Sequence, residues 1–170
     1  MGISSQGQQA IVSKKSGSLS VVFFMAVDCP ITQKYMNTIR EILDRYGEKV
    51  QFVGYFPAGL SKNDASTFRE EYKIPENLKL LGDANHALTN KLNAKVTPEV
   101  FVLEGDAIVY HGAVDNWFYK LGRNRRAVTE HYLINAIDNS LAGTKTKLSK
   151  TEAIGCFIQR TEVKEHQHHQ

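Results

Sequence analysis

Cysteine is scarce in this sequence of 170 residues, where only Cys29 and Cys156 occur. Two cysteines are too few for the disulfide scaffold of a small secreted domain. No pair stands at the spacing of a zinc site, so we expect neither a metal nor another cofactor. Each cysteine therefore has to be interpreted from its own neighbours.

The sequence also lacks a long hydrophobic run and a strong charge of either sign. The longest apolar run, from Val21 to Val27, has the length of a strand and falls well short of the ~20 residues of a membrane helix. The formal charge of +3 is too small to indicate nucleic-acid binding by itself. We therefore expect neither a membrane nor a nucleic acid among the partners, and we predict no particular oligomeric state.

Residues 1–17 are polar and small, which predicts a flexible leader. They lack the apolar centre of a secretory signal. For the sequence as it stands we expect a cytoplasmic location, and a periplasmic or secreted one if a signal has been trimmed from it.

Hydrophobic periodicity predicts alternating strands and helices from residue 18 onward. Apolar segments predict strands at 18–26, 50–56, 78–81 and 100–103, with 108–111 pairing back as a hairpin. Helical spacing predicts one helix between Pro30 and Gly47, a second capped by Ser61 and Asp64, a third opened by Asp83, and a last one ended by Gly143. This order indicates one α/β domain over residues 18–145, with a mixed central sheet and helices on both faces.

A C-terminal extension, residues 146–170, follows the predicted domain. It is polar except for an apolar patch at residues 154–158, which contains the Gly-Cys-Phe-Ile segment, and it ends in a His-rich tail. We expect this tail to be solvated.

Cys29 stands where the first strand meets the first long helix. The opening turn of a helix leaves free N–H groups and about half a positive charge, which stabilises a thiolate and lowers its pKa below about 8.5. Pro30 suits that first turn, and Thr32 is positioned to donate its hydroxyl to the sulfur. The alternative is a buried, inert cysteine.

A second candidate feature is Thr97-Pro98, just before the apolar strand at 100–103. A proline there lies at a strand start or edge. If the peptide bond is cis, the Thr97 backbone can point toward Cys29 and dock an extended substrate. An ordinary trans proline at the end of a loop is the alternative.

These segments resemble the thioredoxin superfamily. Residues 24–32 (FMAVDCPIT) resemble its active-site stretch F-x-A-x-x-C-x-x-C, and residues 96–103 (VTPEVFVL) resemble its cis-proline strand. The closer resemblance is to the redoxin branch, the alkyl hydroperoxide reductase/thiol-specific antioxidant superfamily, some members of which carry Asp-Cys-Pro-Ile, Thr-Pro-Glu-Val-Phe and a terminal Gly-Cys-x-Ile, as this chain does. The resemblance covers roughly residues 18–158 and implies a thioredoxin-like fold with oxidoreductase or antioxidant activity.

The chain departs from both family patterns. Thr32 stands where thioredoxins have their second cysteine, so no disulfide can close within the motif. Peroxiredoxins resemble the pattern P-x-x-x-T-x-x-C. With Cys29 as its cysteine, Val22 stands in place of the proline and Ala26 in place of the threonine. A second thiol must therefore come from Cys156, from a partner protein or from a small thiol. For Cys156, the alternative to this resolving role is packing as part of a terminal strand.

The predicted function is that of a peroxiredoxin- or thioredoxin-like oxidoreductase in which Cys29 attacks a hydroperoxide or a disulfide. Thr32 and Cys156 complete the predicted catalytic set, with Pro30, Thr97 and Pro98 as substrate contacts. Arg123, in a basic cluster with Lys120, Arg125 and Arg126, is a further candidate for holding an anionic substrate, although such a run is more often a solvated loop. The expected partner is a protein or small-molecule thiol reductant. A redox-inactive, protein-binding module is the alternative.

Overall fold

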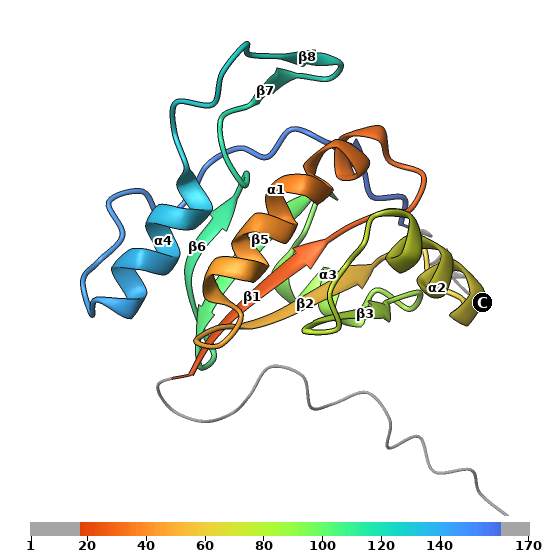
Figure 1. Ribbon diagram of the computed structural model, residues 1–170, viewed down its shortest axis with the longest axis horizontal. Helices are drawn as coiled ribbons and strands as arrows, with labels where there is room; N and C mark the ends of the chain where they lie inside the picture. Colours follow the sequence, from red (N-terminus) through yellow and green to blue (C-terminus); the bar gives the residue numbers. More distant parts are fainter. Residues whose placement is uncertain (1–17, 161–170) are drawn as a thin grey trace, which may run out of the picture.

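The computed structural model describes residues 18–160 (Figure 1). The predicted leader at 1–17 and the histidines of the tail lie outside the described residues. No helix within residues 18–160 is long and apolar enough to cross a membrane.

A five-stranded mixed sheet forms the centre of the molecule, in the order β3-β2-β1-β5-β6. Its strands are β1 (Leu19–Phe24), β2 (Gln51–Phe56), β3 (Leu78–Gly82), β5 (Glu99–Glu104) and β6 (Ala107–Gly112). The first three strands run parallel to one another, whereas β5 is antiparallel to β1 and to β6. This arrangement confirms the predicted mixed sheet.

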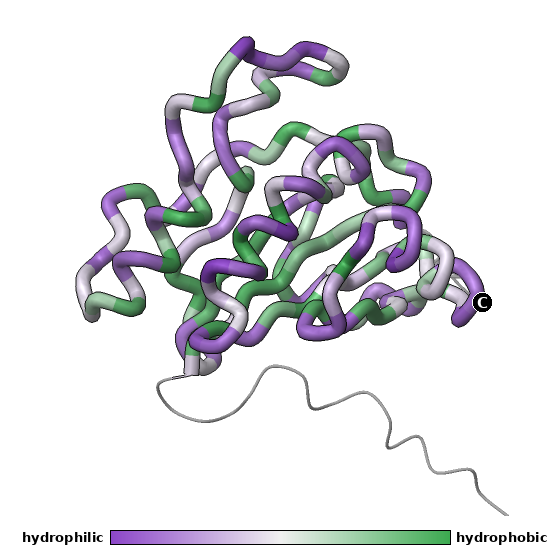
Figure 2. Tube along the Cα trace, viewed as in Figure 1, coloured by the Kyte–Doolittle hydropathy of each residue, from purple (hydrophilic) through white to green (hydrophobic). Residues whose placement is uncertain are grey.

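Helices cover both faces of the sheet. They are α1 (Pro30–Tyr46), α2 (Lys62–Glu71), α3 (Ala87–Leu92) and α4 (Tyr132–Leu141). Helices α1 and α4 and Phe68 of α2 pack in one core cluster, whereas Leu88 and Leu92 of α3 pack in a second one. Figure 2 shows hydrophobic residues concentrated along the central strands and alternating with polar ones along the helices.

Strand β1 lies between these two cores, and every one of its residues is buried. Val21 and Phe23 point into the first cluster, and Val22 and Phe24 into the second. Two-sided burial explains why the sequence of β1 is continuously apolar instead of alternating. It also fixes the point at which the chain leaves the sheet, at Phe24, five residues before Cys29.

One helix begins as the sequence predicts, and another begins later than predicted. Ser61 accepts a hydrogen bond from the Asp64 N–H at 3.0 Å, as the capping pattern predicts. Helix α3, in contrast, begins at Ala87 and not directly after Asp83, because His86 adopts a left-handed backbone (φ 57°). The Asp83 carboxylate still caps this helix, accepting from the Thr89 N–H at 2.7 Å.

Two small sheets were not predicted. Strands β7 (Phe118–Lys120) and β8 (Arg123–Asn124) form a hairpin that projects from the body of the molecule (Figure 1). Strand β4 (Val96–Thr97) pairs antiparallel with β9 (Cys156–Phe157). The chain leading to β9 also packs on the domain, since the Thr151 hydroxyl lies 2.6 Å from that of Tyr110.

Helix α1 is tied to the loop after β6 by a buried hydrogen bond that generates a stability prediction. The Tyr35 hydroxyl donates to Asp115 Oδ1 at 2.6 Å, and burial raises the pKa of this phenol. Replacing Tyr35 by Phe removes one partner of a buried carboxylate, so we expect the free energy of unfolding to fall by about 2 kcal/mol. Tyr132→Phe is the matched control, because its bond to Glu130 is exposed. Chemical denaturation of both variants measures the difference, and equal losses would contradict this account.

Candidate functional site

Cys29 is the residue that caps the N-terminus of α1. Its backbone is extended (φ −83°, ψ 116°), Pro30 occupies the first turn, and no side chain caps the helix. The Cys29 carbonyl accepts the first helical hydrogen bond, from the Gln33 N–H at 3.0 Å. The remaining N–H groups of the first turn have no partner within the helix, and they give this end a partial positive charge.

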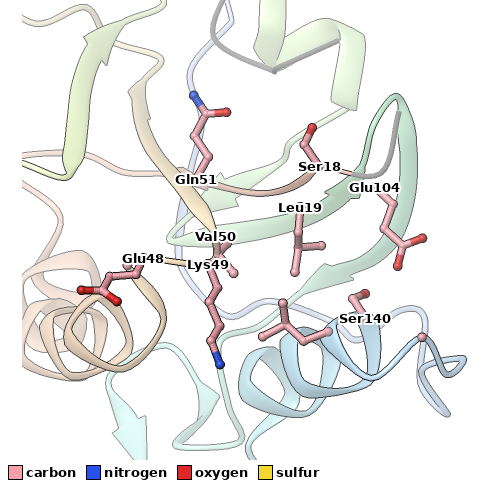
Figure 3. Close-up of a pocket in the computed structure, with 11 residues that line it drawn as sticks. Ser18, Leu19, Glu48, Lys49, Val50, Gln51, Glu104 and Ser140 are labelled. Carbon is pink, nitrogen blue, oxygen red and sulfur yellow. The ribbon is translucent and has the colours of Figure 1, made fainter. Parts of the chain in front are cut away.

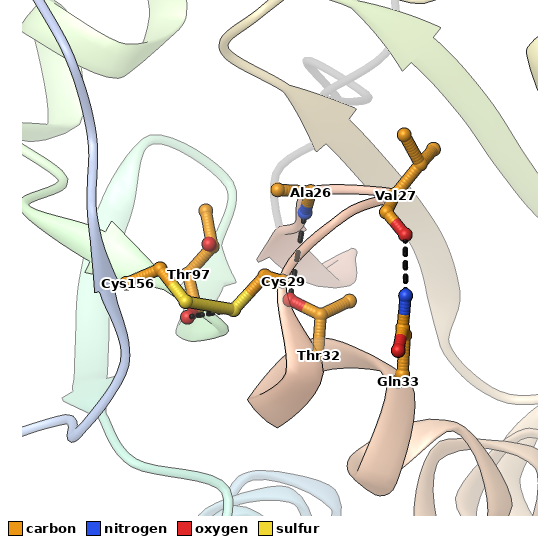
Figure 4. Close-up of a disulfide and its surroundings, with 7 residues drawn as sticks. All are labelled: Ala26, Val27, Cys29, Thr32, Gln33, Thr97 and Cys156. Carbon is orange, nitrogen blue, oxygen red and sulfur yellow. Dashed lines mark hydrogen bonds between the residues drawn. A yellow bond between two sulfur atoms is a disulfide. The ribbon is translucent and has the colours of Figure 1, made fainter. Parts of the chain in front are cut away.

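Cys156 lies against Cys29, and the two form a disulfide across 127 residues of sequence (Figure 4). Their Cα atoms are 6.2 Å apart, within the usual range for a disulfide. Pairing of β9 with β4 places Cys156 opposite Thr97 in register. The patch at 154–158 therefore includes a short terminal strand, and its cysteine is also the partner of Cys29.

The residue before Pro98 contacts the same sulfur. The Thr97–Pro98 peptide bond is cis, and the Thr97 carbonyl oxygen lies 3.3 Å from Cys29 Sγ. In the reduced protein this oxygen can accept a hydrogen bond from the Cys29 thiol. In the reduced protein the carbonyl would favour the thiol form of Cys29, whereas the helix end would favour the thiolate.

Thr32 makes a different contact from the predicted one. Its side chain is buried, and its hydroxyl oxygen accepts a hydrogen bond from the Ala26 N–H at 3.4 Å. Gln33 donates from its side-chain amide to the Val27 carbonyl at 2.8 Å. These two side chains fasten the loop before Cys29 to the first turn of α1 (Figure 4). Thr32 is therefore a positioning residue, and the hydrogen bonds of the described residues include none from it to the sulfur.

A pocket of about 240 Å³ opens beside the disulfide. Its lining comes from the loops after β1 and β2, from β4 and from the segment around β9: Ala26, Asp28, Cys29, Pro57, Ala58, Thr97, Cys156, Phe157, Ile158 and Gln159. Asp28 is the one charged side chain in this lining. Cys29 itself is only 2% exposed, whereas Cys156 is partly exposed and Phe157 is 72% exposed.

The structure does not bring all predicted substrate contacts to this pocket. Thr97 lines it, but Pro30, Pro98 and Arg123 do not. Pro98 is buried, Pro30 is exposed at the start of α1, and Arg123 is exposed in β8 on the projecting hairpin. Arg123 is therefore solvated, as in its alternative interpretation, although it lies in a hairpin strand and not in a loop.

Sequence reasoning included Gly155 in the Gly-Cys-x-Ile segment but missed its role, which is to pack directly against the Thr97 carbonyl. A Cβ atom at this glycine would collide with the Thr97 carbonyl group. The signal was present as a glycine directly before a cysteine in an apolar patch. Nothing in the sequence marked Pro57, Ala58 or Gln159 as pocket residues.

Three larger pockets are lined by the described residues. One, of about 710 Å³, is at the opposite end of the sheet, where β1 begins and α4 ends (Figure 3). A second, of about 630 Å³, is lined by residues 150–155 and Phe157, next to Cys156, and contains Lys95, Glu99, His111 and Lys150. The third, of about 420 Å³, lies beside α4. Burial raises the pKa of the Glu99 carboxyl, and burial together with Lys150 lowers the pKa of the His111 imidazole.

Metal ligation receives no support from the described part of the chain. Within residues 18–160, no three His, Cys, Asp or Glu side chains are grouped so that they could hold a metal ion.

Comparison with known proteins finds similarity at the level of structure. No protein-family model and no curated protein matches the sequence. An uncharacterized conserved protein of Geobacillus kaustophilus superposes with a TM-score of 0.75 at 23% identity, over 87% of this chain and 80% of that one. A hypothetical protein of Sinorhizobium meliloti gives 0.74 at 22% identity, over 88% and 83%. A candidate thioredoxin of Neisseria meningitidis gives 0.56 at 15% identity, over 78% and 80%.

The fold is thioredoxin-like. At these identities the similarity describes the fold alone. Within the thioredoxin-like fold, the order of β1, Cys29 and α1, with the cis-Pro98 loop opposite, agrees with the resemblance found in the sequence. The redoxin branch remains a prediction.

Close packing of Gly155 on Thr97 generates a prediction about disulfide formation. Gly155→Ala would push β9 away from β4, so we expect Cys29 and Cys156 to close their disulfide at least about tenfold more slowly. Gly105→Ala is the matched control, because the added carbon meets open space at the remote β5–β6 turn. Its left-handed backbone makes that variant less stable by about 1 kcal/mol without affecting the cysteines.

Oxidation of the reduced proteins, followed by thiol counting over time, measures this rate. Equal rates in Gly155→Ala and the wild type would show that β4–β9 pairing does not position Cys156.

Proposed function

We propose that this protein is a thiol–disulfide oxidoreductase whose redox pair is Cys29 and Cys156. The observation that carries the proposal is the disulfide between the cysteine at the N-terminus of α1 and the cysteine of β9. A structural disulfide can also join residues 127 positions apart, so what favours exchange chemistry is the place of Cys29 at the helix N-terminus. The same place favours an oxidoreductase over a redox-inactive binding module.

The reduced protein would act in two exchange steps. The Cys29 thiolate attacks one sulfur of a substrate disulfide, and the other substrate sulfur leaves as a thiolate. The Cys156 thiolate then attacks Cys29 Sγ, the mixed disulfide breaks, and the second substrate sulfur leaves. The substrate disulfide is thereby reduced to two thiols, which take protons from solvent, and the two protein thiols are oxidised to the disulfide.

An extended protein segment is the substrate that fits the surroundings of Cys29. The backbone of β4 beside Pro98 already pairs with an extended strand, since β9 occupies it in the oxidised protein. A substrate strand carrying a disulfide can make the same antiparallel bonds to Thr97 once β9 has moved aside.

A hydroperoxide is the less favoured substrate for the same cysteines. Its O–O bond would break on attack by Cys29, giving a sulfenic acid that Cys156 converts to the disulfide with release of water. No arginine lines the pocket to stabilise the leaving oxygen, and Val22 is fully buried in β1. The physiological reductant would be a protein dithiol or a small thiol in either case.

Replacing each cysteine by serine should block a different step of the reaction. In an assay that couples a small dithiol to reduction of a protein disulfide, Cys29→Ser should abolish activity by removing the nucleophile. In Cys156→Ser, Cys29 should still attack the substrate disulfide. The substrate should then accumulate on Cys29 as a mixed disulfide, which intact-mass analysis detects. Full activity of Cys29→Ser would refute the proposed nucleophile.

The same variants distinguish the two substrate classes. Cys156→Ser is exposed to a peroxide pulse and, separately, to a protein disulfide. If the variant gains one oxygen faster than it exchanges with the disulfide, a peroxidase function is favoured.

The helix end predicts an ordering of the two thiol pKa values. Cys29, in Cys156→Ser, should titrate below the ~8.5 of a free cysteine, and Cys156, in Cys29→Ser, should titrate above Cys29, because β9 provides no helix terminus. The rate of alkylation as a function of pH measures both values. The reverse order would mean that burial and the Thr97 carbonyl outweigh the helix.

A further inference from the structure

The disulfide presents two sulfurs to a reductant, and their surroundings differ sharply. We infer that the thiolate that reduces the oxidised protein attacks Cys156 and expels Cys29. This inference rests on the proposed function, and it names the co-reactant as a protein dithiol or small thiol that reacts as an anion.

Access to the two sulfurs is the first argument. Cys29 is 2% exposed and lies under the first turn of α1 and the Thr97 carbonyl. Cys156 is partly exposed, in a two-residue strand whose next residue, Phe157, is 72% exposed. An incoming thiol needs open surface at the sulfur it attacks, and with only 2% of Cys29 exposed that residue offers almost none.

Charge is the second argument. A thiolate that approaches Cys29 meets the carboxylate of Asp28, the one charged side chain lining the pocket, and the Thr97 carbonyl oxygen 3.3 Å from the sulfur. The carboxylate carries a full negative charge and the carbonyl oxygen a partial one, so both repel an anion. Cys156 lines the same pocket, but Asp28 is the direct neighbour of Cys29 in the sequence, whereas the neighbours of Cys156 are the uncharged Gly155 and Phe157.

The leaving group is the third argument. Attack at Cys156 leaves the Cys29 sulfur as the thiolate, at the N-terminus of α1, where negative charge is stabilised. Attack at Cys29 would instead expel the Cys156 thiolate from strand β9, which lacks that stabilisation. Exchange is faster when the departing thiol has the lower pKa, so the helix end favours the first course.

The electrons follow a defined route. The thiolate sulfur of the reductant bonds to Cys156 Sγ, the bond between the two cysteines breaks, and its electron pair goes to Cys29. A second thiolate, from the same dithiol or from another molecule of a small thiol, then attacks the first reductant sulfur, and Cys156 leaves as a thiolate. The Cys29 and Cys156 thiolates each take a proton from solvent. The reductant is oxidised to a disulfide, and the protein returns to two thiols.

Rapid trapping tests this assignment on the oxidised full-length chain. The protein is mixed with excess 2-mercaptoethanol, quenched with acid within the first turnover, alkylated with a maleimide and digested with trypsin. Cleavage after Lys34, Lys150 and Arg160 separates the two cysteines into different peptides. We expect the mixed disulfide on Cys156 and the maleimide on Cys29, in roughly tenfold or greater excess over the reverse labelling.

The reverse labelling, or an even distribution, would overturn the inference. Failure of the proposed function has a different signature, because the starting material would then contain two free thiols and no linked pair of peptides.

A charge variant tests the electrostatic step. Asp28→Asn removes the exposed carboxylate beside Cys29, and we expect the fraction of label on Cys29 to rise by roughly twofold to threefold. Asp106→Asn, at the remote β5–β6 turn, is the matched control and should leave the labelling unchanged. No rise in Asp28→Asn, or the same rise in both variants, would overturn this part of the inference.

Discussion

Antiparallel pairing between Thr97 and Cys156 is the interaction on which the candidate site depends. The pairing sets the position of one sulfur, and the carbonyl of the same Thr97 touches the other sulfur at 3.3 Å. The backbone of the two-residue strand β4 thus contacts both cysteines of the disulfide. The contact is possible because Gly155 has no side chain where the chain passes over the Thr97 carbonyl. Since β4 and β9 contain two residues each, the pairing is weak enough to be exchanged during a reaction, unlike the buried strands of the central sheet.

The position of Cys29 has a separate origin, in the burial of β1. Apolar side chains on both faces of this strand fix its register against β2 and β5. Hydrogen bonds of the Thr32 and Gln33 side chains hold the short loop that follows, so the first turn of α1 begins at a defined point beyond the C-terminal end of β1. Tyr35, one turn further along, anchors the helix to Asp115. The rigid core therefore holds Cys29, whereas a two-residue surface strand holds its partner, which suits the proposed reaction, in which Cys29 stays in place and Cys156 moves.

Much of the fold could be predicted from the sequence because its signals are local. The apolar run of β1, the stripe of α1 and the cap at Ser61 each depend on neighbouring residues. The failures are non-local or depend on one backbone angle. Asp83 caps α3 but does not begin it, since His86 turns the chain into the left-handed region first. Cys29 was recognisable from its strand–helix setting, but its pairing with Cys156 rested on reach alone, because no periodicity links β9 to β4 across 127 residues. Arg123 was a candidate only through its charge, which says nothing of where its hairpin points.

Because the second cysteine lies outside the active-site helix, the redox pair cannot close or open without motion of the chain. In the oxidised protein β9 occupies the edge of β4, so the strand that resolves the reaction also covers the surface on which an extended substrate would lie. The segment has an anchor on each side of Cys156, at Thr151 on Ala113 and at Ile158 on the Lys95 carbonyl. Reduction would break the disulfide that ties Cys156, between these anchors, to Cys29. Only the two-residue pairing of β9 with β4 would then have to be displaced. Movement of Cys156 would thus require local opening and no unfolding of the domain, and in the proposed reaction reduction would make the edge of β4 easier to free for a substrate.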